Sequence, residues 1–483
     1  MRAIAWAWVG VLALTAVSVG WADGAAVYSL DDPYIHLALA RSIQQGGYGI
    51  NPGEWASPSS SPLWPWLLAV VPVGAMAWAP WCINAVCAVA TTWVMRQALR
   101  GPWLPERWQA PAAVLAAFGV NAFGLVMTGM EHSLQVALVA FMAWRVTQRR
   151  FDVWLYAAMA VGPLVRYEVA ALTAPLAVWL WWAHGRRWGP LLATGVAVAG
   201  LLAFSLWLHH LGLPWLPSSV LAKNAERKVL VNVLSSPGFY FLLWWLWRTT
   251  DDRRDWWLLM ALPLAGFLVL GRVGWLGRYE AFMAAWLLVM ALHAASRYPW
   301  GRAQAEPPRV GVPQWPVRWL LGLCLCVPAL WTCTLRTPQA CLNTQRQQVV
   351  MAELARQLGR PVAVNDLGLV AWRSGQHVVD LWGLGSPEVL ARRLQHTVPP
   401  EVWMDEVTRA KGVSHAFIFE RWFPKVPPGW TKVGELRLNV DTVVLPSKVV
   451  SLYATTPEAA SALREAMRRV AQDPVRRALL VEL

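Results

Sequence analysis

Two adjacent carboxylates, Asp31 and Asp32, follow the first hydrophobic segment of this chain. The 28 acids of the sequence divide equally around residue 337, so the pair lies in a long stretch that is poor in acids. A carboxylate can take the proton of an attacking hydroxyl. A neighbouring carboxylate and nearby lipid both raise its pKa toward the range that suits a general base. We therefore predict that Asp31 is a general base.

Asp32 has two roles open to it. Pro33 favours the first position of a helix, which makes Asp32 a candidate N-cap. Residues 35–45 carry apolar side chains at helical spacing with polar ones opposite, which predicts an amphipathic helix at a membrane surface. Alternatively, Asp32 orients an acceptor or shares a divalent cation with Glu131, and oxygen ligands would suit Mg²⁺, Mn²⁺ or Ca²⁺.

Residues 46–62 form a turn-rich stretch after this helix and include Asn51-Pro52-Gly53-Glu54. The next apolar segment, residues 63–73, is too short to cross a membrane and predicts a half-buried or re-entrant helix. Residues 23–75 are therefore expected to form the first outer loop of a membrane-embedded half.

The elements that must position these groups are predicted from composition. Apolar residues make up 57% of the chain, charged residues only 14%, and 35 residues are tryptophan, which is typical of a polytopic membrane protein. Arginine clusters recur in alternate gaps between apolar stretches and mark cytoplasmic loops. These gaps give about eleven spans at about 20 residues each, namely 4–22, 76–95, 110–129, 132–147, 153–169, 170–184, 189–210, 229–247, 256–271, 279–296 and 318–335.

An odd number of spans places the amino terminus in the cytoplasm and the last third of the chain outside, in the periplasm of a bacterium. We expect a membrane domain over residues 1–336 and an extracytoplasmic domain over residues 337–483. Residues 1–26 also have features of a signal peptide, but the closely following helix favours a retained span. The net charge of +14 follows from the topology and favours contact with anionic lipid headgroups, not with nucleic acid.

Cysteine and histidine spacing indicates no zinc site. Cys333 and Cys341 flank the outer end of the last span. The sequence is equally compatible with a disulfide between them and with two free thiols. In the last third, helix-like and strand-like segments alternate, which predicts a small α/β domain. The expected strands are 362–365, 377–381, 416–420, 432–438 and 442–453, and the expected helices are 346–358, 387–395 and 457–471. Asp366 and Asp380 end apolar strands, a place for ligand binding or for turn capping.

The ordered motifs resemble those of integral-membrane GT-C glycosyltransferases, most closely the terminal arabinofuranosyltransferase branch. The resemblance rests on Asp-Asp-x-Tyr-Ile, Gly-x-Gly, Asn-Pro-Gly-Glu and Ser-Pro-Leu-Trp in the first outer loop, and on further stretches around Glu131, Arg166, Lys223 and Arg278. It extends more faintly to residues 365–368 and 379–384. The chain departs from the usual pattern in reading Arg-Tyr-Glu at residues 166–168 and Pro-Trp-Leu-Pro-Ser-Ser at residues 214–219.

The resemblance implies an inverting hexosyl- or pentosyltransferase that moves a sugar from a polyprenyl-phosphate donor to a hydroxyl of a glycan or glycolipid acceptor, on the outer face of the cytoplasmic membrane. Departure of a lipid phosphate requires cationic groups, and Arg166, Lys223 and Arg278 are the candidates, since arginine can grip phosphate with two donors. The candidates for binding or orienting substrate are Glu131, His132, Glu168 and Trp64. Glu168 would pair with Arg166, and Trp64 would stack on a sugar.

Two other classes of protein compete with an enzyme. A transporter or flippase of a lipid-linked sugar would also carry charged residues among its spans, but it predicts an internal repeat, and the sequence contains no visible repeat. A membrane assembly factor whose outer domain binds partners would leave Asp31 replaceable.

Overall fold

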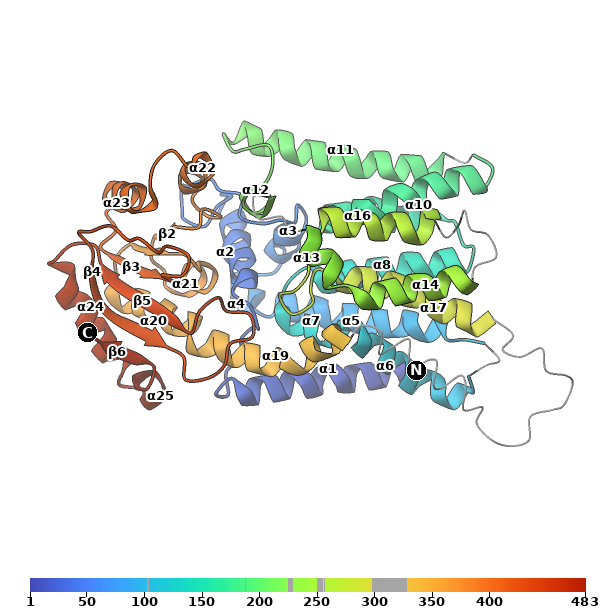
Figure 1. Cartoon of the computed structure of the whole chain (residues 1–483), viewed down its shortest axis with the longest axis horizontal. Coiled ribbons are helices and arrows are strands. Elements are labelled where there is room, and N and C mark those ends of the chain that lie inside the picture. The colour runs from blue at the N-terminus through green and yellow to red at the C-terminus, as the bar shows by residue number, and fades with distance from the viewer. Residues whose placement is uncertain (102–103, 187, 225–228, 250–254, 256, 298–327) are drawn as a thin grey trace, which may run out of the picture.

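The computed structural model describes residues 1–101, 104–186, 188–224, 229–249, 255, 257–297 and 328–483. Helices gather at one end of the molecule and a sheet with its own helices forms the other end (Figure 1). The amino terminus lies at the end of the helical bundle far from the C-terminal domain. This placement agrees with a first helix that runs the length of the bundle toward that domain.

The bundle is built from apolar helices that follow the predicted spans, but several are shorter. Its longer helices are α1 (Arg2–Trp21), α5 (Ala79–Ala98), α6 (Glu106–Gly119), α8 (His132–Thr147), α9 (Val153–Val165), α10 (Ala170–Ala183), α11 (Gly189–His210), α14 (Pro237–Thr249), α17 (Ala281–Arg297) and α19 (Pro328–Arg346). Shorter pieces are α7 (Ala122–Thr128), α13 (Val229–Leu234), η2 (Trp257–Ala261) and α16 (Leu262–Leu270).

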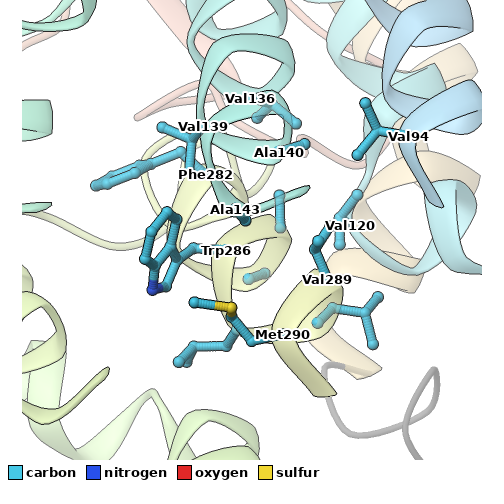
Figure 2. Packing of buried hydrophobic residues seen from close by; sticks show 14 of the residues in the cluster. Val94, Val120, Val136, Val139, Ala140, Ala143, Phe282, Trp286, Val289 and Met290 are labelled. Atoms are coloured by element: carbon cyan, nitrogen blue, oxygen red, sulfur yellow. The ribbon is translucent and has the colours of Figure 1, made fainter. Parts of the chain in front are cut away.

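Close packing of α8 against α17 forms the centre of the bundle. Figure 2 shows Phe282 and Trp286 of α17 beside Val139 and Ala143 of α8. Trp286 is fully buried and its indole donates a hydrogen bond to the Leu259 carbonyl at 2.6 Å. Small alanine side chains let the two helices approach, which is the usual way helices associate in a membrane.

By length and composition, α1 and α11 are the described helices that could cross a membrane, and the bent pair α6–α7 would be a third. The pair bends at Asn121, which adopts a left-handed conformation. Helix α9, the joined segment of η2 and α16, and helix α17 are apolar but shorter than a full crossing. The expected count of eleven spans is therefore not confirmed, and most of the predicted span 318–335 lies outside the described residues.

Three short helices of the first outer loop separate the bundle from the C-terminal domain, namely α2 (Asp32–Gln44), α3 (Trp64–Ala69) and α4 (Val73–Met76) (Figure 1). Asn51 of this loop exchanges two hydrogen bonds with the backbone of Val378, at 2.9 and 3.0 Å. Glu54 accepts a hydrogen bond from Lys411. The loop is thus part of the contact between the two halves and not a free connection.

The C-terminal domain contains a six-stranded mixed sheet in the order β2-β1-β3-β5-β4-β6. Its strands are β1 (Val362–Val364), β2 (Val378–Asp380), β3 (His415–Ile418), β4 (Thr431–Arg437), β5 (Val449–Ala454) and β6 (Leu480–Glu482). Strand β1 pairs in parallel with β2 and β3, and the remaining pairs are antiparallel. The predicted α/β domain is present. However, the boundary expected at residue 336 falls within α19, which continues into the domain.

The helices of this domain are α20 (Gln348–Leu358), α21 (Gly368–Arg373), α22 (Pro387–Gln395), α23 (Pro400–Ala410), α24 (Ala459–Val470) and α25 (Pro474–Arg477). The strand expected over 442–453 begins only at Val449. Pro446 precedes it and lacks a backbone donor for a sheet. Helices α21, α23 and α25 and strand β6 have no counterpart among the predicted elements. Cys333 and Cys341 both lie on α19 and are free thiols, so the disulfide is not formed.

Candidate active site

A cavity of about 570 Å³ lies where the two halves of the chain meet. The membrane half contributes Asp31, Asp32, Arg272, Trp275, Arg278 and Tyr279, and the C-terminal domain contributes Asn365, Asp366, Trp382, Leu384, Arg421 and Trp422. Charged and aromatic side chains from segments more than 200 residues apart therefore converge on one space. A cavity of this size with a few polar groups among apolar walls is typical of a small-molecule site.

Asp31 holds the C-terminal domain at this cavity. Its carboxylate accepts hydrogen bonds from the backbone N–H groups of Gly368 and Leu369, the second at 2.8 Å. At the other end of α21, Arg41 donates to the carbonyls of Ala371 and Trp372, at 3.0 and 3.1 Å. Asp31, which precedes α2, and Arg41 of α2 thus satisfy backbone groups at both ends of α21 with charges of the favourable sign.

Gly368 permits this contact, because a Cβ atom there would lie 2.2 Å from the Asp31 carbonyl oxygen and 2.7 Å from its carboxylate. We expect Gly368→Ala to separate α21 from α2 and to lower stability by about 1–3 kcal/mol, the usual cost of overpacking. Thermal unfolding of the purified protein measures this loss. Gly429→Ala is the matched control, since a Cβ there would meet nothing within 4 Å. Equal melting temperatures for the two variants would contradict the proposed docking contact.

Asp31 and Asp366 form a second contact across the same interface. Burial, and then the nearby Asp366 carboxylate, raise the pKa of Asp31 well above its ordinary value. Burial also raises the pKa of Asp366, which accepts a hydrogen bond from Gln348 at 2.7 Å. Two carboxyl groups in this arrangement favour a shared proton. The raised pKa of Asp31 was predicted, but the responsible neighbour is Asp366 and not Asp32.

This pair predicts a pH dependence of stability. Both groups have raised pKa values when folded, so folding favours their protonated forms. Their contribution is complete below the unfolded pKa and is lost as the pH rises through the folded value. We expect Asp366→Asn to reduce this loss, and hence to raise the melting temperature relative to wild type at about pH 8 but not at about pH 5. Thermal scans across this range should show it, with Asp441→Asn as an exposed control. Parallel curves for wild type and Asp366→Asn would contradict the shared proton.

Asp32 faces Arg278 across the cavity. Arg278 donates from Nη2 to the Asp32 carboxylate at 2.5 Å and to the Tyr279 hydroxyl at 2.9 Å. The Arg278 side chain is 4% exposed, whereas that of Asp32 is 37% exposed. Nε and Nη1 of Arg278 are buried without a hydrogen-bond partner among the described residues. A buried guanidinium with two unused donors on a cavity wall suits an anionic ligand.

The N-cap prediction for Asp32 is wrong. Helix α2 begins at Asp32, which leaves Asp31 at the N-cap position, and the Asp31 side chain does not cap this helix. Asp31 instead accepts from the start of α21, while Asp32 extends toward Arg278. The expected roles of the two neighbouring aspartates are therefore exchanged. Asp31 has the capping role, at α21, and Asp32 faces the cavity.

Arg166 is at the centre of a buried ion cluster beside the cavity. Nη1 donates to Ser60 Oγ at 2.6 Å and to Glu131 Oε1 at 2.9 Å. Nε and Nη2 donate to the two carboxylate oxygens of Glu168, which confirms the predicted pairing of these residues. Nε, Nη1 and Nη2 of Arg166 thus all donate to other side chains of the protein. The structure favours a role for Arg166 in positioning its neighbours over a role as a phosphate clamp.

Glu131 and His132 lie behind the cavity wall. Glu131 is fully buried, and its second oxygen is 3.7 Å from His36 Nε2. The ring of His132 packs edge-on against Tyr279, with centroids 5.5 Å apart. Since Asp32 lines the cavity and Glu131 does not, this pair does not fit a shared cation. Within the described ranges, no cluster of three or more His, Cys, Asp or Glu residues could hold a metal ion.

Trp64 and Lys223 are not placed as substrate-binding residues in the cavity. Trp64 is fully buried in the hydrophobic cluster that the first outer loop shares with the C-terminal domain and lines neither described cavity, so it does not present a face to a sugar. Lys223 falls within helix α12 (Ser218–Asn224), but its side chain lies outside the described part of the structure.

A second cavity of about 270 Å³ adjoins the first. It is bordered by Ser60, Arg166, Glu168, Val220, Leu270 and Gly271, among others. Arg272 lines both cavities. The second space is thus walled in part by the first residues of α10 and the last residues of α16.

Sequence reasoning missed several residues of the main cavity. Asp366 was left between a ligand-binding and a turn-capping role, and Arg421 and Trp422 were not considered. Asn365, Asp366 and Trp382 lie in the stretches that carried only a faint family resemblance. Their position after apolar strands was the available signal, because loops at the carboxyl ends of parallel strands form ligand sites.

Comparison with solved structures identifies the class of fold. ArnT from Cupriavidus metallidurans in the apo state shares the fold with a TM-score of 0.50 and 15% identity, over 96% of this chain and 99% of that one. The same protein bound to undecaprenyl phosphate matches with a TM-score of 0.48 and 15% identity, over 94% and 98% of the two chains. The chain therefore shares the fold of apo ArnT over 96% of its length.

Sequence comparison adds one match. A family described as "Domain of unknown function (DUF8728)" matches residues 339–454, which form most of the C-terminal domain. No curated protein sequence matches the chain.

Proposed function

We propose that this protein is a GT-C-type glycosyltransferase that moves a sugar from a polyprenyl-phosphate donor to a hydroxyl of a glycan or glycolipid. The observation that carries the proposal is the facing pair of Asp32 and Arg278 in a cavity at the end of a helical bundle. The fold shared with apo ArnT supports it.

Of the three cations first considered, Arg278 is the proposed phosphate ligand. Its Nε and Nη1 can donate to two phosphate oxygens as negative charge grows on the leaving group. Arg272 lies between the two cavities and is the second candidate. The first isoprene units of the carrier would then occupy the smaller cavity, beside Leu270 and Val220.

Asp32 is the proposed base, in place of Asp31. Both oxygens of Asp31 already accept backbone N–H groups, and that carboxyl faces Asp366. Asp32 is more exposed to the cavity, and a phosphate bound by Arg278 would compete with it for the guanidinium. The freed carboxylate takes the proton of the acceptor hydroxyl. The acceptor oxygen bonds to the anomeric carbon as the bond from that carbon to the phosphate oxygen breaks, with inversion and release of polyprenyl phosphate.

The orientation in the membrane is part of the proposal. The amino terminus would be cytoplasmic, and the C-terminal domain and cavity would face the periplasm of a bacterial cell. A phosphatase fused after Leu483 is therefore expected to be active, and one fused after Arg100 to be inactive. Activity of both fusions, or of the Arg100 fusion alone, would contradict this orientation.

The proposal is tested with the purified protein in detergent and a panel of polyprenyl-phosphate sugars. The panel includes a pentofuranosyl donor, because the sequence resembles the terminal arabinofuranosyltransferase branch, and also hexosyl donors. Transfer to a glycan in detergent supports an enzyme, since micelles have no second side to which a lipid could be moved. The alternative, a flippase of a lipid-linked sugar, predicts no product in detergent and donor movement across the bilayer of proteoliposomes.

A further inference from the structure

The wall of the main cavity that belongs to the C-terminal domain is built from three loops. Asn365 and Asp366 follow β1, Trp382 and Leu384 follow β2, and Arg421 and Trp422 come after β3. These three strands are mutually parallel in the order β2-β1-β3, so their carboxyl ends lie at one edge of the sheet. The chain leaves β1 for β2 on one side and then crosses to β3 on the other, and ligands bind at such a switch point.

Trp382 is held rigidly at this edge. Asp380 accepts the backbone N–H groups of Trp382 and Gly385, at 2.8 and 2.9 Å. The turn requires glycine at position 383, where φ is +89° and a Cβ atom would lie 2.6 Å from the backbone nitrogen of Leu390. The guanidinium of Arg393 lies 3.5 Å from the centroid of the Trp382 ring. An indole fixed in this way loses little freedom when it binds a ligand.

Trp422 extends the aromatic surface. Its ring centroid lies 4.4 Å from that of Trp382, and both residues line the cavity. Phe419 supports Trp422 from the domain side, with centroids 5.7 Å apart. The cavity therefore has an aromatic wall on the side contributed by the C-terminal domain, whereas the membrane half contributes the reactive Asp32 and Arg278.

Asn365 adds a directed polar group to this wall. Its Oδ1 accepts the N–H of Phe419 at 3.0 Å, which fixes the orientation of the amide. Its Nδ2 is buried without a hydrogen-bond partner among the described residues, although Asn365 is only 3% exposed and lines the cavity. Buried amide donors are normally satisfied, so this one indicates a ligand acceptor group.

We propose that Trp382, Trp422 and Asn365 form the subsite for the acceptor, and that the acceptor presents a saccharide ring here. The inference rests on the proposed transferase activity. A sugar offers an apolar C–H face to the two indoles and a hydroxyl oxygen to Asn365 Nδ2. Asp32 lines the same cavity as these three residues, as a base for the attacking hydroxyl requires.

The test uses the full-length protein in lipid nanodiscs and a panel of methyl glycosides of hexoses, pentoses and hexuronic acids. Saturation-transfer NMR should detect binding of at least one glycoside, with the strongest transfer to ring C–H protons. We expect Trp422→Ala to weaken that binding about tenfold, since an aromatic contact contributes on this scale. Trp422→Phe should retain most of the binding. Trp154→Ala, an exposed tryptophan of α9, is the matched control.

Donor and acceptor effects are separated by a second measurement on the same variants. Undecaprenyl phosphate binding should be unchanged in Trp422→Ala, and the KM for a glycan acceptor should rise while the KM for the donor does not. Loss of undecaprenyl phosphate binding in Trp422→Ala with normal glycoside binding would overturn the inference and assign the aromatic wall to the lipid. Absence of glycoside binding to the wild type would also overturn the acceptor subsite. That result would not contradict the proposed use of the polyprenyl-phosphate donor. Glycoside binding through Trp422 without any sugar transfer would retain the saccharide subsite and refute the transferase.

Discussion

Replacing Asp32 with asparagine is expected to lower the rate of sugar transfer about 1000-fold, as is usual for loss of a general base. Asparagine keeps the size of the side chain and can still accept from Arg278, so the fold and the cavity should remain. It cannot take a proton from the acceptor hydroxyl. Initial rates with a saturating polyprenyl-phosphate sugar measure the effect, and the KM for the donor should change little.

Asp31→Asn is the matched control for this experiment, because the two residues are adjacent and chemically identical. The Asp31 carboxylate holds the N-terminus of α21, so this variant should change the thermal stability more than the turnover. If Asp31→Asn abolishes transfer in a fully folded protein while Asp32→Asn retains it, Asp31 is the base and our assignment is wrong.

Replacing Arg278 with glutamine is expected to weaken undecaprenyl phosphate binding about 10- to 100-fold, which is the usual value of hydrogen bonds to a charged group. Glutamine removes the positive charge and at least one of the two donors that have no described partner. The variant also leaves the Asp32 carboxylate without its guanidinium. Binding is measured directly by titration in detergent, independently of any acceptor.

The Arg278→Lys variant distinguishes the contribution of the positive charge to lipid binding from that of the planar donor geometry. Lysine restores the charge but not the planar pair of donors, so it should recover only part of the affinity. Arg100→Gln, in the predicted cytoplasmic loop, is the control and should bind the lipid as well as wild type. Equal affinity of wild type and Arg278→Gln would remove Arg278 from the phosphate site.

The sequence predicted the residues of the membrane half better than their roles. The adjacent acids Asp31 and Asp32, Arg278 and the pairing of Arg166 with Glu168 were identified from spacing, topology and the family resemblance. The exchange of roles between Asp31 and Asp32 could not be predicted, because the partner of Asp31 is the backbone of Gly368, 337 residues further along the chain. Local cap rules favoured Asp32, but a tertiary contact determined the outcome.

The C-terminal wall of the cavity was the part least visible in the sequence. Asn365, Trp382 and Trp422 are separated by long stretches and meet only because β1, β2 and β3 are neighbouring parallel strands. In a chain with 35 tryptophans, nothing in the sequence distinguishes Trp422 from the buried Trp64. The helix lengths were overpredicted for a similar reason, since long apolar runs do not show where a chain bends, as it does at Asn121.

A cryo-EM map of the protein with undecaprenyl phosphate tests the central claim most directly. We predict phosphate density against Arg278 in the main cavity, with the first isoprene units in the smaller cavity beyond Arg272. Lipid density elsewhere, with both cavities unoccupied by the phosphate, would contradict the assignment of this junction as the donor site.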